Sequence, residues 1–259
     1  MDVASQKDNR GVFLDEVGIR NVRIPIKVKD RSTKREQQYT IGTFDAFVGL
    51  DTEQRGTHMS RIVECIYNNR DNINQAGLAH LCQDLCEKLE TTSSVVHVGF
   101  PYFLDRYSPE SHLHNLMVYQ GWFLGELTQA GFNFQLGVKV DIMSVCPCAL
   151  AECGNGNSHV QRGEVNINVQ PRSDEWIWLE ELIDIAETAG CSPLYERLKR
   201  PDEKAVVLNG FKNPKFVEDI VRDIVVALKE NKRVDNYRVS CENFESIHQH
   251  NAYARAYND

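Results

Sequence analysis

No part of this 259-residue sequence forms a long apolar run. A helix that crosses a bilayer needs about 20 consecutive apolar residues, and no stretch approaches that length. The first residues, Met1 to Arg10, are polar and lack the apolar core of a signal peptide. We therefore expect a cytoplasmic protein without a membrane partner, in a compartment where thiols stay reduced.

The chain also lacks an excess of positive charge. Its 29 Lys and Arg residues are outnumbered by 37 Asp and Glu residues, so the formal net charge is -8. A general nucleic-acid or acidic-membrane surface needs the opposite balance, and we expect no nucleic-acid partner. An anionic ligand would need a local group of basic side chains. The hydrophobic share of 42% is typical of a globular protein with a substantial core.

Without export, the eight cysteines are expected to be core residues, metal ligands or nucleophiles before they are disulfides. Cys82 and Cys86 fall on the apolar face, or its edge, of a predicted helix, which indicates a place in the core.

The hydrophobic patterns predict two strands, two helices and two strands, and then the same order again. Predicted strands cover residues 22–28, 39–48, 94–103, 115–127, 132–145, 163–169, 234–244 and 252–257. Predicted helices begin at residue 57, with Thr57 as N-cap, and after residue 74, and cover residues 175–189 and 214–229, the last with Asn213 as cap. The halves share no literal sequence repeat.

This order predicts an α+β fold of two ββααββ units, each an antiparallel sheet with helices layered on one face. We expect a polar N-terminal segment at 1–20, a first unit at 21–128 and a second unit at 129–259 that carries most of the site. Each unit leaves sheet edges open, and open edges favour pairing with another subunit, so we expect a homo-oligomer.

Residues 143–163 concentrate reactive side chains on a backbone that Pro147 and two glycines are expected to keep irregular. Cys146 or Cys148, together with His159, can supply two ligands to an ion such as zinc, and a third must come from elsewhere. Two other interpretations stay open: ordinary thiols beside a turn, and a nucleophilic cysteine with His159 as its base.

Carboxylates in two segments are candidates for the third ligand. Residues 200–204 contain a proline and alternating charges, which predicts a loop whose carboxylates are free to point inward or, alternatively, a solvated turn. Glu218 lies at the flank of the apolar stripe of the last long helix. It can face a cleft or form a surface ion pair with Arg222.

The run 242–250 places Glu245, His248 and His250 around few core residues, which favours a pocket. The two histidines share a face if the segment is an extended strand. Glu245 would then point the other way, so a bend is required if all three line one pocket.

These segments together resemble the type IB family of GTP cyclohydrolase I, metal-dependent tunnelling-fold enzymes that open the pathway to folate. The most specific segments are Cys146-Pro147-Cys148, His159-x-Gln161-Arg162, Leu198 to Lys204, Asn213 to Asp219 and Glu242 to His250. The resemblance also includes Val17-Gly18-Ile19, Arg23 to Ile26 and Gly56 to Arg61.

The resemblance implies conversion of GTP and water to 7,8-dihydroneopterin triphosphate and formate, by a homotetramer with sites at subunit interfaces. It implies one divalent metal, zinc, manganese or iron, held by Cys146, His159 and Glu203. It places Glu218, His248 and His250 with Cys146 in the catalytic set, and Glu245 at the guanine edge. The cations expected to bind the triphosphate are Arg162, Lys199, Arg200 and Lys204, with Arg61 as a weaker candidate.

The loop 149–158 departs from the family pattern. Family members usually continue with Ser-Lys-Glu-Ile-Ser, whereas this chain has Ala149 to Cys153 and one extra residue. Cys153 becomes an additional thiol that could compete as a ligand or pair with Cys148. Two alternatives remain: a tunnelling-fold nitrile reductase that uses a cysteine nucleophile and NADPH, and a non-catalytic metal-binding protein.

Overall fold

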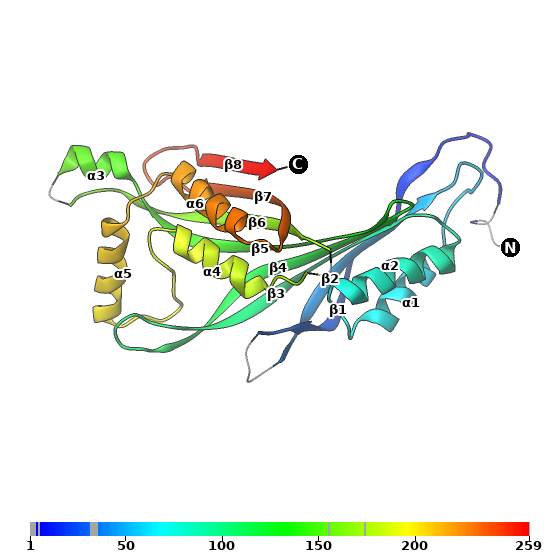
Figure 1. Cartoon of the computed structure of the whole chain (residues 1–259), viewed down its shortest axis with the longest axis horizontal. Helices are drawn as coiled ribbons and strands as arrows, with labels where there is room; N and C mark the ends of the chain where they lie inside the picture. The colour runs from blue at the N-terminus through cyan, green and yellow to red at the C-terminus, as the bar shows by residue number, and fades with distance from the viewer. Residues whose placement is uncertain (1–3, 5, 32–35, 155, 174, 259) are drawn as a thin grey trace. The chain divides into compact units, whose positions relative to one another are not determined.

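The computed structural model describes residues 4, 6–31, 36–154, 156–173 and 175–258 (Figure 1). The strands are β1 (Leu14–Lys29), β2 (Gln37–Leu50), β3 (Ser94–Tyr107), β4 (His114–Thr128), β5 (Gly131–Val145), β6 (Val160–Pro171), β7 (Val234–Asn243) and β8 (Ala252–Asn258). The helices are α1 (Met59–Asn69), α2 (Gln75–Leu89), α3 (Pro147–Cys153), α4 (Leu179–Ala189), α5 (Arg200–Lys212) and α6 (Val217–Glu230).

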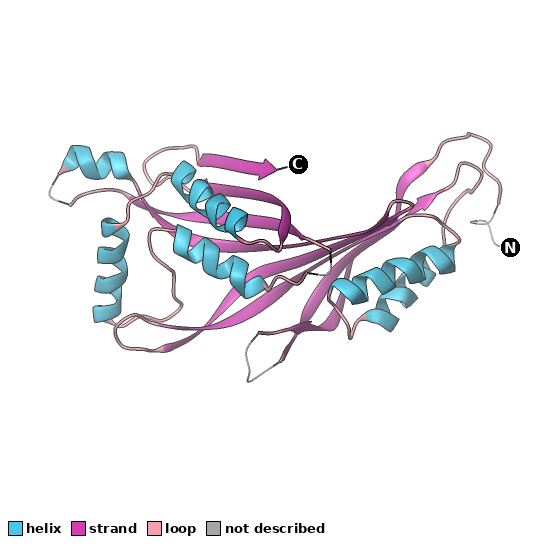
Figure 2. Ribbon diagram, in the orientation of Figure 1, coloured by secondary structure: helices cyan, strands magenta, loops and turns pink. Residues whose placement is uncertain are grey.

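The strands form a sheet in chain order, and each is hydrogen-bonded to the next from β1 to β8. This confirms the predicted α+β class (Figure 2), and the second half contains the predicted strands and helices with two further helices, α3 and α5, among them. By compactness the chain divides into unit 1, residues 1–102 with 122–136, and unit 2, residues 103–121 with 137–259. The division into residues 21–128 and 129–259, which rests on the order of the elements, stays a prediction. None of the described helices is long and apolar enough to cross a membrane.

In unit 1, α1 and α2 pack against each other and against β1 and β2. Alternate residues of β2 are buried, as expected for a strand with one face on a core. α2 begins after residue 74 as predicted, and Asn74 caps it, since its side chain accepts a hydrogen bond from the backbone N–H of Gly77. The predicted N-cap of α1 was wrong by one residue, because the helix begins at Met59 with His58, not Thr57, as its N-cap.

In unit 2, α4 packs against β6, and α6 packs against β7 and β8. The buried stripe of α6 includes Ile220, Val221, Ile224 and Leu228, as its periodicity predicts. The predicted start of this helix was wrong: α6 begins at Val217, and Asn213 is the C-cap of α5. The Asp219 carboxylate accepts the backbone N–H of Phe216 at 3.1 Å, which satisfies one donor at the observed start.

Two helices of unit 2 were expected to be irregular. Residues 200–204 are the first turn of α5, and Pro201 is tolerated there because the first turn needs no intrahelical N–H bond from it. Pro147 likewise begins α3, so residues 147–153 are helical rather than a loop. In both cases a proline marks the start of a helix where it was expected to interrupt regular structure.

Candidate functional site

Cys146 and His159 are brought together by the ends of β5 and β6. The backbone N–H of Cys146 donates to the carbonyl of His159 at 3.3 Å. The Ser158 hydroxyl donates to the carbonyl of Cys146 at 2.7 Å and ties the end of the loop to the same point. The two strongest sequence-predicted donors, 13 positions apart, are therefore neighbours in space.

Cys146 is also the N-cap of α3. Its Sγ accepts the backbone N–H of Ala149 at 3.5 Å, and the side chain is partly exposed. A peptide N–H aimed at sulfur from the start of a helix suits a sulfur that carries negative charge, as a metal-bound thiolate does.

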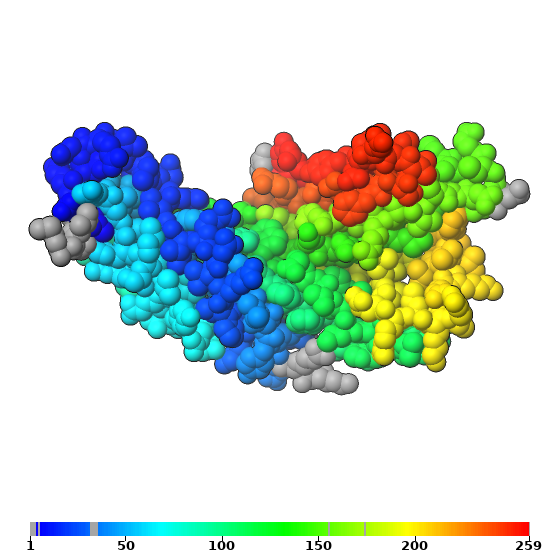
Figure 3. All heavy atoms as spheres, turned by 180° about the vertical axis from the view of Figure 1, so that it is seen from behind, coloured from blue at the N-terminus to red at the C-terminus, as the bar shows by residue number. Residues whose placement is uncertain are grey.

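His159 is held between two side chains from different segments. Its Nδ1 lies 2.7 Å from Oε1 of Gln161 and 3.7 Å from Oε2 of Glu245. The His159 and Glu245 side chains are only 13% and 12% exposed. Glu245 follows β7, and the backbone N–H of Phe244 donates to the carbonyl of Arg162 at 2.8 Å, which brings this segment to the start of β6. The residues that follow β7 (orange-red) lie at the surface beside the green residues at the end of β5 in Figure 3.

Glu245 Oε2 is buried, and no described residue gives it a hydrogen bond. A buried carboxylate oxygen without a donor costs free energy, so such an atom in a native structure calls for an explanation. A ligand that brings N–H groups to this oxygen would supply the missing bonds. Glu245 was expected to accept hydrogen bonds from the guanine edge, and this geometry is suited to that role.

The segment after Glu245 is bent, so the two histidines do not lie on an extended strand. β7 ends at Asn243, and residues 246–250 form a run of bends. His248 and His250 are exposed, and their rings are stacked with centroids 5.1 Å apart at an interplanar angle of 15°. The sequence required a bend for Glu245 and the histidines to line one pocket, and a bend is present; their shared pocket stays a prediction.

At the start of α5 the two adjacent carboxylates have different roles. Asp202 is fully buried and accepts the backbone N–H groups of Glu110 at 2.9 Å, Ser111 at 2.8 Å and Lys199 at 2.8 Å, as well as the Ser111 hydroxyl at 2.6 Å. Burial opposes its charge, but these hydrogen bonds hold the pKa of Asp202 well below its usual range.

Glu203 is 47% exposed and pairs with the guanidinium of Arg200 at 2.8 Å. The structural role of Asp202 was not predicted. An acidic residue directly after a proline is typical of the first turn of a helix, and this is the signal in the sequence that indicates such a role.

The remaining predicted residues lie at the surface. Glu218 is exposed in the first turn of α6, and its predicted partner Arg222 instead pairs with Asp219 at 3.2 Å. Arg61 donates to the backbone carbonyl of Lys88 at 3.2 Å. The four main candidates for triphosphate binding, Arg162, Lys199, Arg200 and Lys204, are all exposed.

The described part of the chain contains no group of three or more His, Cys, Asp or Glu side chains placed to hold a metal ion. Cys146 and His159 fit together as two donors, because Gln161 occupies Nδ1 of His159 and leaves Nε2 available. The structure does not bring Glu203 into a cluster with them, and the set of three ligands stays a prediction.

The other thiols divide by burial. Cys82 and Cys241 are buried, and burial raises the pKa of each to about 12, so they stay protonated. Cys82 is therefore a core residue, as predicted, and Cys86 lies half-buried at the edge of the same helix. Cys148 and Cys153 are free and exposed on α3.

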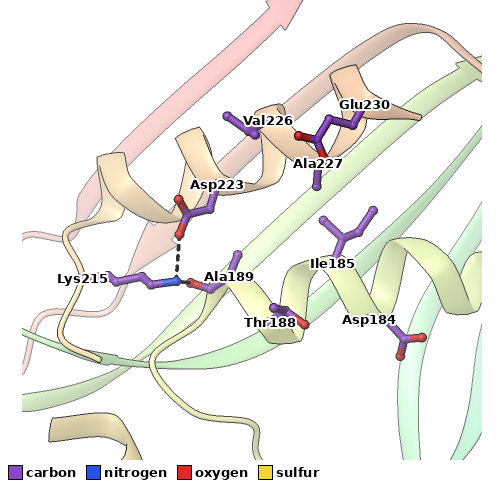
Figure 4. Close-up of a pocket in the computed structure, with 9 residues that line it drawn as sticks. All are labelled: Asp184, Ile185, Thr188, Ala189, Lys215, Asp223, Val226, Ala227 and Glu230. Atoms are coloured by element: carbon purple, nitrogen blue, oxygen red, sulfur yellow. Dashed lines mark hydrogen bonds and ion pairs between the residues drawn. The ribbon is translucent and has the colours of Figure 1, made fainter. Parts of the chain in front are cut away.

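A pocket of about 490 Å³ lies between α4 and α6 (Figure 4). Its apolar lining includes Ile185 and Val226. At one end, Nζ of Lys215 donates to the carbonyl of Ala189 at 3.0 Å and to the carboxylate of Asp223 at 2.8 Å. The pocket contains no thiol, no imidazole and none of the predicted site residues.

Comparisons with known proteins identify the relatives of this chain. The model of a family described as "Type I GTP cyclohydrolase folE2" matches residues 1–254. A GTP cyclohydrolase FolE2 of Thermosipho africanus is 40% identical over 253 residues, which cover 98% of this chain and 96% of that protein. A GTP cyclohydrolase FolE2 of Desulfosudis oleivorans is 41% identical over 254 residues, with the same two shares covered.

Among solved structures, a uricase from Arthrobacter globiformis is similar, with a TM-score of 0.60 and 10% identity over 99% of this chain and 95% of the uricase. A uricase from Bacillus fastidious has a TM-score of 0.59 and 9% identity over 96% of this chain and 94% of that one. At this identity the likeness concerns the fold alone, and it confirms the predicted tunnelling fold.

Proposed function

Because the chain belongs to the type I GTP cyclohydrolase folE2 family, we propose that it converts GTP and water to 7,8-dihydroneopterin triphosphate and formate. This reaction would be the first step of tetrahydrofolate biosynthesis in the cytoplasm. The observation that carries the proposal is the buried Oε2 of Glu245, to which none of the described residues donates a hydrogen bond and which lies 3.7 Å from Nδ1 of His159. A purine edge with N–H groups would satisfy this oxygen.

The proposed site contains one divalent metal, either zinc, manganese or iron. Cys146, His159 and Glu203 would hold it, and Cys146 and His159 fit this role because one has an N–H at its sulfur and the other has Nε2 available. When bound, the metal would lower the pKa of a water molecule and supply hydroxide at neutral pH.

The chain's own side chains would bind and orient GTP and move protons. Glu245 would accept the N–H groups of the guanine edge, which fixes the purine in the site. His248, His250 and Glu218 would carry protons as the imidazole ring opens and formate leaves. The exposed side chains of Arg162, Lys199, Arg200 and Lys204 would offset the charge of the triphosphate despite the negative net charge of the chain. We propose that these parts are completed in a homotetramer with sites at subunit interfaces.

The test is incubation of the full chain with GTP and Zn²⁺, Mn²⁺ or Fe²⁺ in turn, with formate and pterin fluorescence as the two products measured. The proposal fails if no metal supports product. A product that ends in a cyclic phosphate would contradict the proposed triphosphate. Nitrile reduction with NADPH by the metal-free protein would instead identify the alternative enzyme of the same fold.

The ligand assignment is tested by metal content after gel filtration. Cys146→Ala and His159→Ala are expected to lose both metal and activity, because each removes one of the three proposed metal ligands. Cys148→Ala is the matched control, a thiol two residues away that is exposed on α3. Full metal retention in the first two variants would contradict the assignment.

A further inference from the structure

A buried polar chain runs from β7 through β5 to β6 and ends on His159. Asn243 donates from Nδ2 to the hydroxyl of Ser144 at 3.0 Å, and Gln161 donates from Nε2 to the same hydroxyl at 3.4 Å. Oε1 of Gln161 then lies 2.7 Å from Nδ1 of His159. Ser144, Asn243 and Gln161 are 0%, 3% and 8% exposed, so water does not compete for these bonds.

The contact with Cys241 at the far end of this polar chain determines which way the Asn243 amide faces. Sγ of Cys241 lies 3.7 Å from Oδ1 of Asn243, and burial keeps this thiol protonated, so it is the donor. Oδ1 of Asn243 is then the acceptor, and its Nδ2 faces Ser144. Gln161 likewise places its Nε2 on the Ser144 hydroxyl, so its oxygen faces His159.

An amide oxygen accepts hydrogen bonds and never donates one. Nδ1 of His159 must therefore carry the hydrogen, and in the neutral ring Nε2 keeps its lone pair. Glu245 Oε2 lies 3.7 Å from the same Nδ1, which is beyond hydrogen-bonding distance, so the hydrogen bond at this nitrogen is the one to Gln161.

We propose that Gln161, held by Ser144 and Asn243, is a positioning residue that fixes the ring orientation and the Nδ1–H tautomer of His159 and so presents Nε2 to the metal. The outer hydrogen bond of a metal-bound histidine is often made by a carboxylate or a backbone carbonyl, and it sets both the tautomer and the affinity for metal. Here a buried glutamine takes that place.

Gly163 makes room for this arrangement. Gly163 is paired with Asn243 across β6 and β7, and a Cβ added to it would lie 2.5 Å from Oδ1 of Asn243. Any larger residue would push the Asn243 amide away from Ser144 and Cys241. Gly163 thus supports the same chain of hydrogen bonds, because its lack of a Cβ leaves room for the Asn243 amide.

The first measurement is the ¹⁵N spectrum of the metal-free full chain with labelled histidine, because ring nitrogen shifts distinguish the two tautomers. The ring signals of His159 are assigned as those that disappear in His159→Ala, and they are expected to show the Nδ1–H form. In Gln161→Leu this preference should be lost, and Gln161→Glu should restore it through a carboxylate acceptor. A wild-type protein in the Nε2–H form would overturn the proposal without any variant.

The second measurement is Zn²⁺ affinity by competition with a chelator. Gln161→Leu is expected to weaken binding about 10- to 100-fold, in line with other outer partners of metal-bound histidines. The matched control is Gln38→Leu, which removes a glutamine in unit 1 that is 5% exposed and donates to Asp30 at 2.8 Å. It should lower stability and leave Zn²⁺ affinity unchanged.

Equal losses of Zn²⁺ affinity in the two leucine variants, or no loss in Gln161→Leu, would contradict the positioning role. The inference rests on the proposed function for the use of the metal, but its readouts do not depend on turnover. If the protein makes no pterin and still shows the predicted tautomer and Zn²⁺ affinities, the proposed reaction fails and the positioning role stands.

Discussion

Asp202 and Glu203 show how contacts assign different roles to adjacent carboxylates. Both lie in a segment that the sequence singled out, and both are acidic residues in the first turn of α5. Asp202 is fully buried under four hydrogen bonds, whereas Glu203 is 47% exposed beside Arg200. The sequence could nominate the pair for a role but could not separate them, because the separation depends on the distant turn at residues 108–113.

Glu245 provides the sharpest prediction for a single residue. Glu245→Gln keeps the shape of the side chain but puts an N–H where a purine N–H must donate. Losing a hydrogen bond to a charged group costs about 1.5 to 3 kcal/mol, that is, about 10- to 150-fold in affinity for GTP. Calorimetric titration of GTP into the metal-loaded protein measures this, and metal content should not change.

Glu242→Gln is the control for this prediction, since the side chain of Glu242 is three residues away and accepts from Asn251 at 2.7 Å. It should bind GTP as the wild type does. If Glu245→Gln also binds GTP normally, the assignment of the guanine edge is wrong.

At the scale of elements, hydrophobic periodicity predicted the helices and strands whose apolar faces pack on a core. The eight strands named above and the helices α1, α2, α4 and α6 were predicted, because all of them except β8 place a regular set of apolar residues on a core, and β8 keeps the alternation of a strand. The helices α3 and α5 were missed. α3 has no buried residue and α5 only Asp202, Val206 and Gly210, so periodicity gives little signal.

The start of α5 is held by tertiary contacts, which sequence periodicity does not contain. We expect Asp202→Asn to lower the unfolding temperature and to release α5 locally, because each carboxylate oxygen accepts two of the four hydrogen bonds and the amide nitrogen that replaces one of them accepts none. Hydrogen exchange should show faster exchange in residues 200–212 and in the turn at 108–113. Glu203→Gln, measured without metal, should change stability by about 0.5 kcal/mol or less. Unchanged exchange in Asp202→Asn would contradict the role given to this carboxylate.

The pairing of β2 with β3 predicts a pH dependence in unit 1. His97 lies opposite Asp45, and its ring is 5.9 Å from that of Trp122. Burial lowers the pKa of His97 below its ordinary 6.5, and this outweighs Asp45, which favours the charged form and is itself paired with Arg20. Below pH 6.5 the unfolded chain takes up a proton that the folded chain resists, so stability falls as pH decreases through this range.

His97→Gln should flatten this part of the stability profile. The measurement is the unfolding temperature between pH 8 and pH 5. Over this range the unfolding temperature of the wild type should fall further than that of the variant. His80→Gln is the control, because the side chain of His80 is 66% exposed on α2. Parallel profiles for the wild type and His97→Gln would show that burial of the His97 ring does not contribute to the pH dependence of stability.

At the scale of the whole molecule, composition and motif order predicted a type I GTP cyclohydrolase and the fold, but not the completed site. The order of the five motifs along the chain was sufficient for the resemblance, and the family model that matches is folE2 rather than the type IB family named by the resemblance. The geometry of the ligands was not accessible, because a sequence motif gives residue types and spacing, while coordination requires distances across elements or between subunits. Cys146 and His159 met through neighbouring strand ends; Glu203 lies on the exposed side of a helix start.

The proposed assembly allows a direct test of where Glu203 belongs. If Cys146 and Glu203 of one site come from different subunits, Cys146→Ala and Glu203→Gln are each inactive alone but complement each other in mixed tetramers. Each site would then need its cysteine from a Glu203→Gln subunit and its glutamate from a Cys146→Ala subunit. With random mixing in equal amounts, both conditions are met at about a quarter of the sites. Co-expressed and co-purified with two different tags, the mixture should therefore show about a quarter of wild-type pterin formation. If both residues come from one chain, every chain carries one lesion and the mixture stays inactive, so the absence of complementation would assign Glu203 to the same subunit as Cys146.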